Sequence, residues 1–473
     1  MSIRKMTGMR TLPGFTNPSA MTGSLLSKWV LIAPAILLRI SGTSLSYAAF
    51  ALLVVHAARG YSQAIQALFL SWLFISLNNE IFPPVASVEL IRVLILGVAA
   101  LRVILDIFNR RTPAIVSGVT LPLMFFIGLC LVNAIFVSEL SVLSFLKAFF
   151  FGLMSLCVLG TWSRLGPLRE GLEVWFLKAL TAIALLSILL LPLGRGYEVN
   201  GYGFQGVLNQ PQGFGIMMGL LTTWQLGSML TKQQFSASQL LRLGLFAALL
   251  YMSASRTGML ACLLGTLGAG LIALFSRRPE LRRVLASMRR VTLLAIGGTL
   301  IILSIIYSQT ILQGLETAVF KGNEDTGFSE SFEGSRGGLV DQSMENFREQ
   351  PFFGSGFALP SYLDSLEIVY DPVFGLPVSA PIEKGILPVA VLEELGIVGA
   401  VCFLWLIFSL VREVARKGQY HMIGLLVSAL AINLGEAVLF SPSGFGLLVW
   451  LAIGMAVAPS VQVNTQSNAR RTP

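Results

Sequence analysis

The sequence predicts an all-α polytopic membrane protein with about 12 to 14 transmembrane helices. Of its 473 residues 55% are hydrophobic and only 12% are charged, and the mean hydropathy is +0.76. Soluble globular domains carry about 25% charged residues, so this chain is too apolar to be one of them. Apolar runs of roughly 20 residues, the length that crosses about 30 Å of hydrocarbon, recur along the chain. The short alternating segments of a membrane β-barrel are absent from the sequence.

The apolar runs give the predicted elements in order. Residues 1–28 carry Lys and Arg among Gly, Pro, Ser and Thr, and they predict a cytoplasmic tail without the features of a cleavable signal. Arg39 and Gly42 divide the first apolar stretch, so its number of spans stays open. A bundle over 29–311 and C-terminal helices over 385–460 are predicted, with a cytoplasmic tail at 461–473. The candidate spans are 29–41, 43–58, 64–82, 88–107, 114–137, 142–162, 171–194, 211–231, 237–253, 257–276, 290–311, 385–411, 420–438 and 443–460.

Lysine and arginine in short connections predict the orientation, because basic loops stay on the cytoplasmic side. The basic connections alternate with acidic ones such as "NNEIFPPVASVE" and "VSELS". The clearest case is "SRRPELRRVLASMRR", which holds six arginines between 277 and 290. Both termini are therefore predicted inside, and the net charge of +9 reflects topology and lipid contact rather than nucleic-acid binding. The other basic connections contain Arg59, Arg102, Arg110, Arg111, Arg164, Arg169, Lys232, Arg242, Arg412 and Arg416.

One long polar segment, residues 312–384, is predicted on the outer side. It holds twelve of the 24 acids and only four Lys or Arg residues. A loop of this length is usually functional or disordered. Because "LVDQSMENF" has a weak helical period and "PFFGSGFALP" is apolar enough to pack, we expect an ordered extracytoplasmic lid.

The polar group "SASRTG" places Arg256 between two apolar runs, at a tight outer turn. One interpretation is a turn whose arginine reaches lipid headgroups. The other is a fixed cation facing the bundle interior, which is costly unless an anion pairs with it. A lipid-linked pyrophosphate would be such an anion, since the guanidinium forms a planar fork that suits phosphate oxygens.

Further candidates lie in the long loop and in the helix after it. Arg336 precedes a helix-like run that contains Arg348, and an ion pair within the loop explains them equally well. Glu383 and Lys384 lie at the outer mouth of the next span, where a helix N-terminus favours an acid in any case. Glu394, with its neighbour Glu393, lies about three turns further along that span. An unpaired carboxylate would be expensive there, so we expect an arginine partner or hydrogen bonds.

Two more candidates lie in the outer connection "GRGYEVNGYGFQGVLNQPQGFG". It contains Arg195 and Gln210 among Gly, Tyr and Asn. Aromatic and amide groups bind sugars well, although glycine-rich loops are often only loops. We expect no metal and no cofactor, because the chain has only His56 and His421 and its four cysteines lie inside apolar runs without metal-ligand spacing.

In this order the motifs resemble the O-antigen ligase/polymerase family of bacterial membrane glycosyltransferases. The resemblance rests on "SASRTG" after an outward helix and on a large outer loop before the final spans. In that loop "SRGGLVDQSMENFREQPFFGSGF" is similar to the family's Arg-then-NPxxGxGF pattern. "LEELGIVGAVCFLWL" is similar to its E-x-G-x-x-G helix, with Glu394, Gly396 and Gly399 in register. The similarity covers roughly residues 200–440.

The resemblance implies a GT-C-like helical fold in the bacterial inner (plasma) membrane, with the active site facing the periplasm. The implied partners are a polyprenyl-pyrophosphate-linked oligosaccharide donor, an acceptor glycan and membrane lipid, and a chain-length regulator is a further candidate. Arg256 and Arg336 would bind the pyrophosphate leaving group without a metal. The acceptor hydroxyl would attack the anomeric carbon with inversion.

The family's ligases usually carry a histidine nine residues before this glutamate, and here that position is Gly385. Glu383, two residues away, could serve as the base instead. The sequence therefore favours a polysaccharide polymerase over a ligase that transfers glycan to lipid or protein. A transporter or flippase of lipid-linked sugars is the alternative of another class. It would favour internal repeats and charges along a central path, whereas here the charges gather at the outer boundary.

Overall fold

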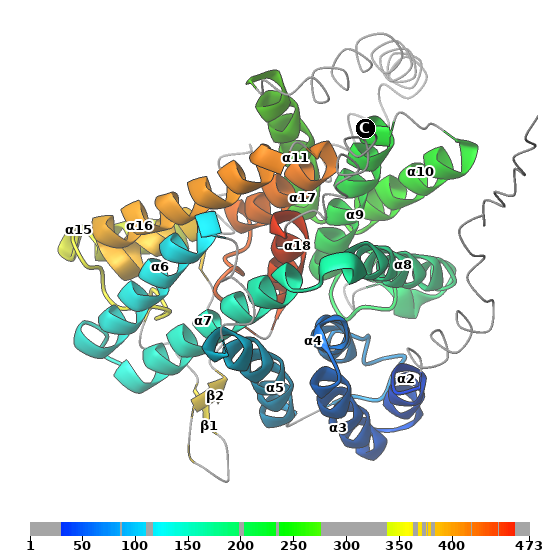
Figure 1. Ribbon diagram of the computed structural model, residues 1–473, viewed down its shortest axis with the longest axis horizontal. Helices are drawn as coiled ribbons and strands as arrows, with labels where there is room; N and C mark the ends of the chain where they lie inside the picture. Colours follow the sequence, from blue (N-terminus) through cyan, green and yellow to red (C-terminus); the bar gives the residue numbers. More distant parts are fainter. Residues whose placement is uncertain are drawn as a thin grey trace, which may run out of the picture.

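The computed structural model describes residues 30–85, 88–109, 117–197, 203–232, 236–275, 338–362, 368–370, 375, 377–379, 384–417, 419–442 and 444–458. In this part of the chain fourteen α-helices form a bundle, and one short antiparallel ribbon projects from it (Figure 1). The helices are α2 (Ile32–Ser41), α3 (Thr43–Ala58), α4 (Tyr61–Ile75), α5 (Glu89–Phe108), α6 (Ser117–Phe136), α7 (Ser141–Ser163), α8 (Arg169–Ile188), α9 (Pro211–Lys232), α10 (Ala237–Met252), α11 (Arg256–Phe275), α15 (Gly338–Glu349), α16 (Leu387–Lys417), α17 (Tyr420–Ala431) and α18 (Phe445–Val457). The ribbon pairs β1 (Val369–Tyr370) with β2 (Pro377–Ser379).

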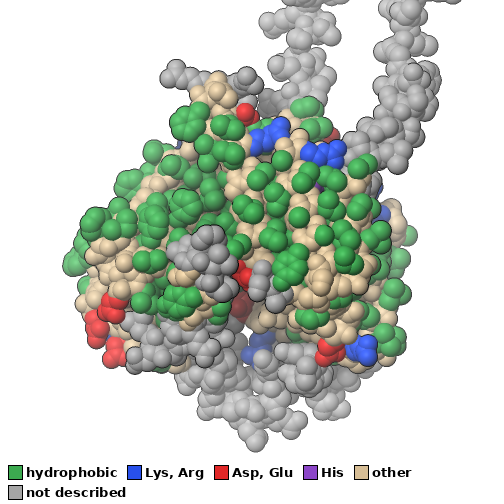
Figure 2. Space-filling view, turned by 90° about the horizontal axis from the view of Figure 1, so that it is seen from below, with side chains coloured by type: hydrophobic (Ala, Val, Ile, Leu, Met, Phe, Trp, Pro, Cys, Tyr) green, Lys and Arg blue, Asp and Glu red, His purple; other side chains and the backbone are tan. Residues whose placement is uncertain are grey.

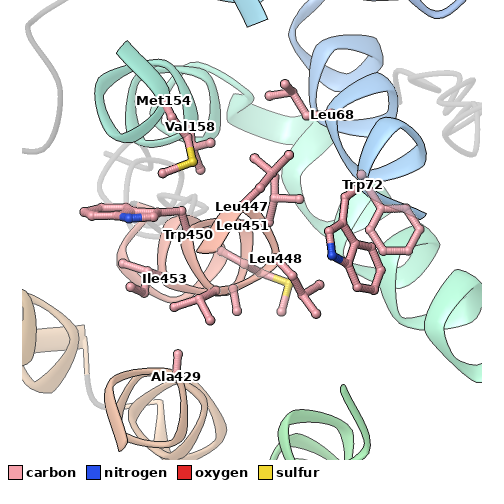
Figure 3. Packing of buried hydrophobic residues seen from close by; sticks show 14 of the residues in the cluster. Leu68, Trp72, Met154, Val158, Ala429, Leu447, Leu448, Trp450, Leu451 and Ile453 are labelled. Carbon is pink, nitrogen blue, oxygen red and sulfur yellow. The ribbon is translucent and has the colours of Figure 1, made fainter. Parts of the chain in front are cut away.

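Helix α18 forms the centre of the bundle. It is apolar all round and its residues from Gly446 to Val457 are buried, as expected of a helix enclosed on every side. Leu68 and Trp72 of α4, Met154 and Val158 of α7, and Ala429 of α17 surround it (Figure 3). Helices α4, α7 and α17 thus share one apolar core through their contacts with α18.

Two cations satisfy the last carbonyl groups of α18. Arg169 donates from Nη1 to the carbonyl oxygen of Ala458 at 2.6 Å and from Nη2 to that of Met455 at 3.1 Å. Lys417 donates to the same end of the helix, at Val457 and Ala458. Basic groups suit a helix C-terminus because its free carbonyls carry partial negative charge. This contact ties α8 and α16 to the central helix.

Helices α9, α11 and α17 approach one another closely at small residues. A Cβ atom on Gly219 of α9 would lie 2.6 Å from the carbonyl oxygen of Gly258 in α11. A Cβ atom on Gly265 of α11 would lie 2.7 Å from that of Ser428 in α17. Small residues at such crossings let membrane helices gain van der Waals contact. These three helices therefore form a tightly packed group beside α18.

The first apolar stretch forms two short helices that pack together, α2 and α3, with Gly42 between them. Arg39 near the end of α2 is 1% exposed and donates from Nε to the carbonyl oxygen of Phe74 at 2.9 Å. Its Nη1 donates to the carbonyl oxygen of Pro83 at 2.8 Å. The arginine that divides the apolar stretch in the sequence thus joins α2 to the connection after α4.

Within the described residues, four helices are long and apolar enough to cross a membrane: Gly118–Phe136, Ser141–Ser163, Gly166–Ile188 and Leu387–Lys417. Shorter apolar helices accompany them, and the outward-facing surface carries many large apolar side chains, such as Phe136 and Leu404. Figure 2 shows a face on which hydrophobic side chains predominate and charged ones gather in a few small groups. The all-α polytopic membrane fold is thereby confirmed. The predicted span 290–311 lies outside the described residues.

Helix ends that the charges assign to the same side of the membrane contact one another at each end of the bundle. At one end Arg102 donates from Nη1 to the carbonyl oxygen of Ala58 at 3.1 Å, and Gly160 packs against Val103. These residues belong to the connections that carry the predicted cytoplasmic arginines. At the other end the amide nitrogen of Asn78 donates to the carbonyl oxygen of Arg195 at 2.8 Å. The side of the membrane that each end faces stays a prediction.

We predict that Arg169→Ala destabilises the bundle by about 3 kcal/mol, because it removes a donor from each of two buried carbonyl groups and breaks the ion pair of Nε with Oε1 of Glu173 at 2.6 Å. Thermal unfolding of the purified protein in detergent measures the effect. Arg242→Ala is the matched control, since Arg242 is exposed on α10. Equal unfolding midpoints for the two variants would contradict the role of Arg169.

Candidate functional site

Helix α16 is broken at Gly396, in the predicted E-x-G-x-x-G motif. Gly396 has φ 65° and ψ −164°, a conformation that is essentially restricted to glycine. The helical hydrogen bonds are interrupted there, and groups outside the helix replace them. The N–H of Ile397 donates to the carbonyl oxygen of Pro351 at 2.9 Å, and that of Val398 donates to Phe352 at 3.3 Å. Part of the long loop therefore completes the helix.

That part, residues 351–358, is called the docked segment here. The amide of Ser355 donates to the carbonyl oxygen of Glu393 at 2.8 Å, and the amide of Gly356 donates to that of Glu394 at 3.1 Å. The backbones lie so close that a Cβ atom on Gly354 (φ 70°) would be 2.4 Å from the carbonyl carbon of Glu394. The two predicted motifs, "PFFGSGF" and "LEELGIVG", are thus the two halves of one backbone contact.

The side chains of Glu393 and Glu394 point into this contact and are buried, with exposed fractions of 0% and 3%. Lys384 lies between them, with Nζ 2.6 Å from Oε2 of Glu393 and 3.6 Å from Oε1 of Glu394. The amide of Ala358 donates to Oε2 of Glu394 at 2.8 Å. Both carboxylates accept hydrogen bonds, as expected, and their cation is a lysine rather than an arginine.

Helix α15 docks on the same group through its polar side. Asn346 donates from Nδ2 to Oε1 of Glu393 at 2.7 Å. The hydroxyl of Ser361 donates to Oε2 of Glu393 at 3.1 Å and lies 3.0 Å from the hydroxyl of Ser343. Each oxygen of Glu393 therefore has a donor from the loop, which offsets the cost of burying its charge. The helix predicted over "LVDQSMENF" is confirmed by these bounds and contacts.

Arg256 is the first residue of α11 and is exposed at the turn after α10. The hydroxyl of Ser255 accepts a hydrogen bond from the amide of Gly258 at 3.2 Å, which caps the helix. The amide of Phe204, in the connection before α9, donates to the carbonyl oxygen of Met252 at 2.9 Å. The turn that carries Arg256 is therefore fixed both by its own serines and by a neighbouring connection.

A carboxylate that sequence reasoning missed lies beside this turn. Gln212 of α9 donates from Nε2 to Oε1 of Glu436, in the connection before α18. The carbonyl oxygen of Gln212 lies 3.4 Å from the hydroxyl of Ser255, and Gly435 packs against Thr257. Glu436 gives no signal in the sequence, because nothing there relates it to residues 212 and 255–257.

One connection, residues 435–442, contacts both groups of residues. Gly435 packs against Thr257 next to Arg256, and Phe440 lies 5.3 Å from Phe357 of the docked segment, ring centroid to ring centroid. The turn at Arg256 and the broken helix α16 thus border the same short stretch of chain. The structure brings these two motifs to one end of the bundle.

The structure describes three of the other candidate site residues, and each of them is exposed. Arg195 is exposed in a 3-10 turn (Gly194–Gly196), Gln210 is exposed immediately before α9, and Arg348 is exposed on α15. The side chains of these three residues take no part in the contacts described above. Arg336 and Glu383 lie outside the described residues, two residues before α15 and one before Lys384, respectively. Among the described residues no three His, Cys, Asp or Glu side chains are grouped to hold a metal ion.

We predict that Gly396→Ala separates the loop from α16 and lowers stability by about 2 kcal/mol or more. The added Cβ atom would lie 2.3 Å from the backbone of Phe352, and alanine disfavours the φ of this residue. The apparent midpoint of thermal unfolding in detergent measures the change. Gly97→Ala on α5 is the control, because its Cβ atom would meet nothing within 4 Å. A midpoint for Gly396→Ala as high as that of the control would contradict the docking described above.

Comparison with known families gives one match. Residues 241–404 match the family model described as O-Antigen ligase. The matched stretch begins in α10, includes Arg256 and the docked segment, and ends in the second half of α16. No curated protein matches the chain. The family match supports the assignment of this chain to the O-antigen ligase/polymerase family, the family that its motifs resemble.

Proposed function

We propose that the chain is a polysaccharide polymerase that transfers a polyprenyl-pyrophosphate-linked glycan to an acceptor sugar hydroxyl. The family match supports a glycosyltransferase-type enzyme that uses a lipid-linked oligosaccharide and an acceptor. The proposal places the enzyme in the bacterial inner membrane with its site facing the periplasm. Acceptor glycan, membrane lipid and a regulator of chain length are its proposed partners.

The observation that carries the proposal is the position of Arg256. It begins a capped helix and its side chain is exposed at the turn after α10, where a guanidinium suits the oxygens of an anion. The turn belongs to a membrane bundle, so an anion attached to a lipid tail can reach it. A pyrophosphate on a polyprenyl chain has this combination of charge and tail.

The proposed reaction is a displacement at the anomeric carbon of the donor glycan. The acceptor hydroxyl attacks that carbon, the bond from the carbon to the pyrophosphate oxygen breaks, and polyprenyl pyrophosphate leaves with the bonding electrons. Arg256 and Arg336 stabilise the negative charge that grows on the leaving oxygen, without a metal ion. The acceptor's proton passes to a carboxylate, for which Glu383 is the proposed base.

A ligase is the second candidate, because the matching family model is described as O-Antigen ligase. Its transfer would use the same donor and a lipid or protein acceptor. The absence of a histidine at position 385, nine residues before Glu394, favours the polymerase. Gly385 is buried beside Lys384, so no side chain at that position serves as a base.

We predict that Arg256→Ala and Arg336→Ala each lower glycan assembly by about a hundredfold or more, because each removes a cation from the leaving group. Glu383→Gln should lower it as well, by removing the base. Gel analysis of surface glycan in cells that express each variant measures the effect, with membrane levels of the protein determined in parallel. Arg242→Ala, an arginine at the opposite end of the bundle, is the control. Glycan ladders of normal length from both arginine variants would exclude the pyrophosphate role.

Deletion of the gene should separate the two candidate functions. A polymerase deletion leaves single repeat units attached to the acceptor and removes the long chains. A ligase deletion removes all attached glycan, while polymer accumulates on the lipid carrier. The second pattern on gels of surface glycan and carrier lipid would overturn the polymerase in favour of the ligase.

A further inference from the structure

The docked segment is held from two sides, and the second side lies on helices outside the matched family region. Asn133 of α6 is 4% exposed and bonds to the segment twice. Its Nδ2 donates to the carbonyl oxygen of Phe353 at 2.7 Å, and its Oδ1 accepts from the amide of Phe357 at 2.7 Å. The side-chain amide of Asn133 therefore both donates to and accepts from the segment, as a residue of a paired strand would with its backbone.

Lys147 of α7 adds a charge to the same place. Its Nζ lies 3.5 Å from the carbonyl oxygen of Ala358, and its charge interacts with those of Glu394 and Lys384. Two lysines thus accompany two carboxylates in one group, in which Lys147 is half-buried and Lys384, Glu393 and Glu394 are buried. The Nζ atom of Lys384 lies 2.6 Å from Oε2 of Glu393 and 3.6 Å from Oε1 of Glu394. Because Lys384 is nearer to Glu393, Lys147 is the second cation for Glu394.

Every amide from Gly354 to Ala358 has an acceptor. These acceptors are the carbonyl oxygen of Gln350 for Gly354, those of Glu393 and Glu394 for Ser355 and Gly356, Asn133 Oδ1 for Phe357, and Glu394 Oε2 for Ala358. The segment is neither helix nor strand, so these five consecutive amides are held by surrounding groups. Their protection from hydrogen exchange therefore depends on those groups. Ser138, in the connection between α6 and α7, packs against Gly356 and closes this side.

We infer that Asn133 and Lys147 are positioning residues of the transfer reaction, and the inference rests on the function proposed above. They act by holding the docked segment against the break in α16. The segment continues from α15, which begins two residues after Arg336, and the buried group includes Lys384, which follows Glu383. The proposed catalytic residues, Arg336 and Glu383, are therefore close in sequence to residues that the docked segment and its partners hold in place.

Hydrogen–deuterium exchange of the purified full-length protein tests the holding step directly. Lys147→Met and Asn133→Ala should each raise exchange in peptides covering 353–359 about tenfold, the factor that corresponds to one net hydrogen bond. Exchange in α9 and α11 should stay unchanged. Lys178→Met is the matched control, a lysine exposed on α8, and should change neither region.

Glycan assembly in cells tests the positioning step with the same variants. Lys147→Met should lower it at least tenfold at normal membrane levels, and Lys147→Arg should retain most of it.

Three results would overturn the inference. They are fast exchange at 353–359 with full activity, lost activity with unchanged exchange, and fast exchange throughout the bundle. If deletion of the gene leaves surface glycan unaltered, the proposed function fails. The exchange measurements then still decide whether Asn133 and Lys147 hold the segment.

Discussion

The replacement of helical hydrogen bonds at Gly396 by bonds to the docked segment is the constraint on which this end of the bundle depends. A helix that crosses a membrane must satisfy its own backbone groups, because the surrounding hydrocarbon offers no partners. Helix α16 satisfies them with the docked segment instead, through four backbone hydrogen bonds at Pro351, Phe352, Ser355 and Gly356. The loop is therefore part of the helix's internal bonding, and the carboxylates beside the break are held by it.

The sequence predicts most of the helices well, since apolar runs and basic connections mark their ends. The sequence also identifies the two motifs that form the contact at α16, but it does not show that they contact each other. The span 385–411 is predicted without a break, because one glycine in an apolar run is compatible with an unbroken membrane helix. Only the nearby backbone of Phe352 and the positive φ of Gly396 reveal the interruption.

Residues that meet across long distances in the chain are the ones that sequence reasoning cannot find. Lys147 and Asn133 resemble ordinary polar residues near helix ends, and their partners lie more than 200 positions away. Glu436 pairs with Gln212 across 224 positions. Arg256, by contrast, is evident from the sequence because it interrupts an apolar pattern locally. The turn at Arg256 and the loop motifs were thus predictable separately, whereas the residues that support them could be identified only from the fold.

The central place of α18 has a consequence for biosynthesis. The ribosome makes this helix after α4, α7, α16 and α17, yet it fills the space among them and presents its last carbonyls to Arg169 and Lys417. The earlier helices therefore enter the membrane as an incomplete ring with a vacant axis. The ring closes only when α18, the last helix of the described chain, inserts. The connection that borders Arg256 and the docked segment becomes ordered at the same step.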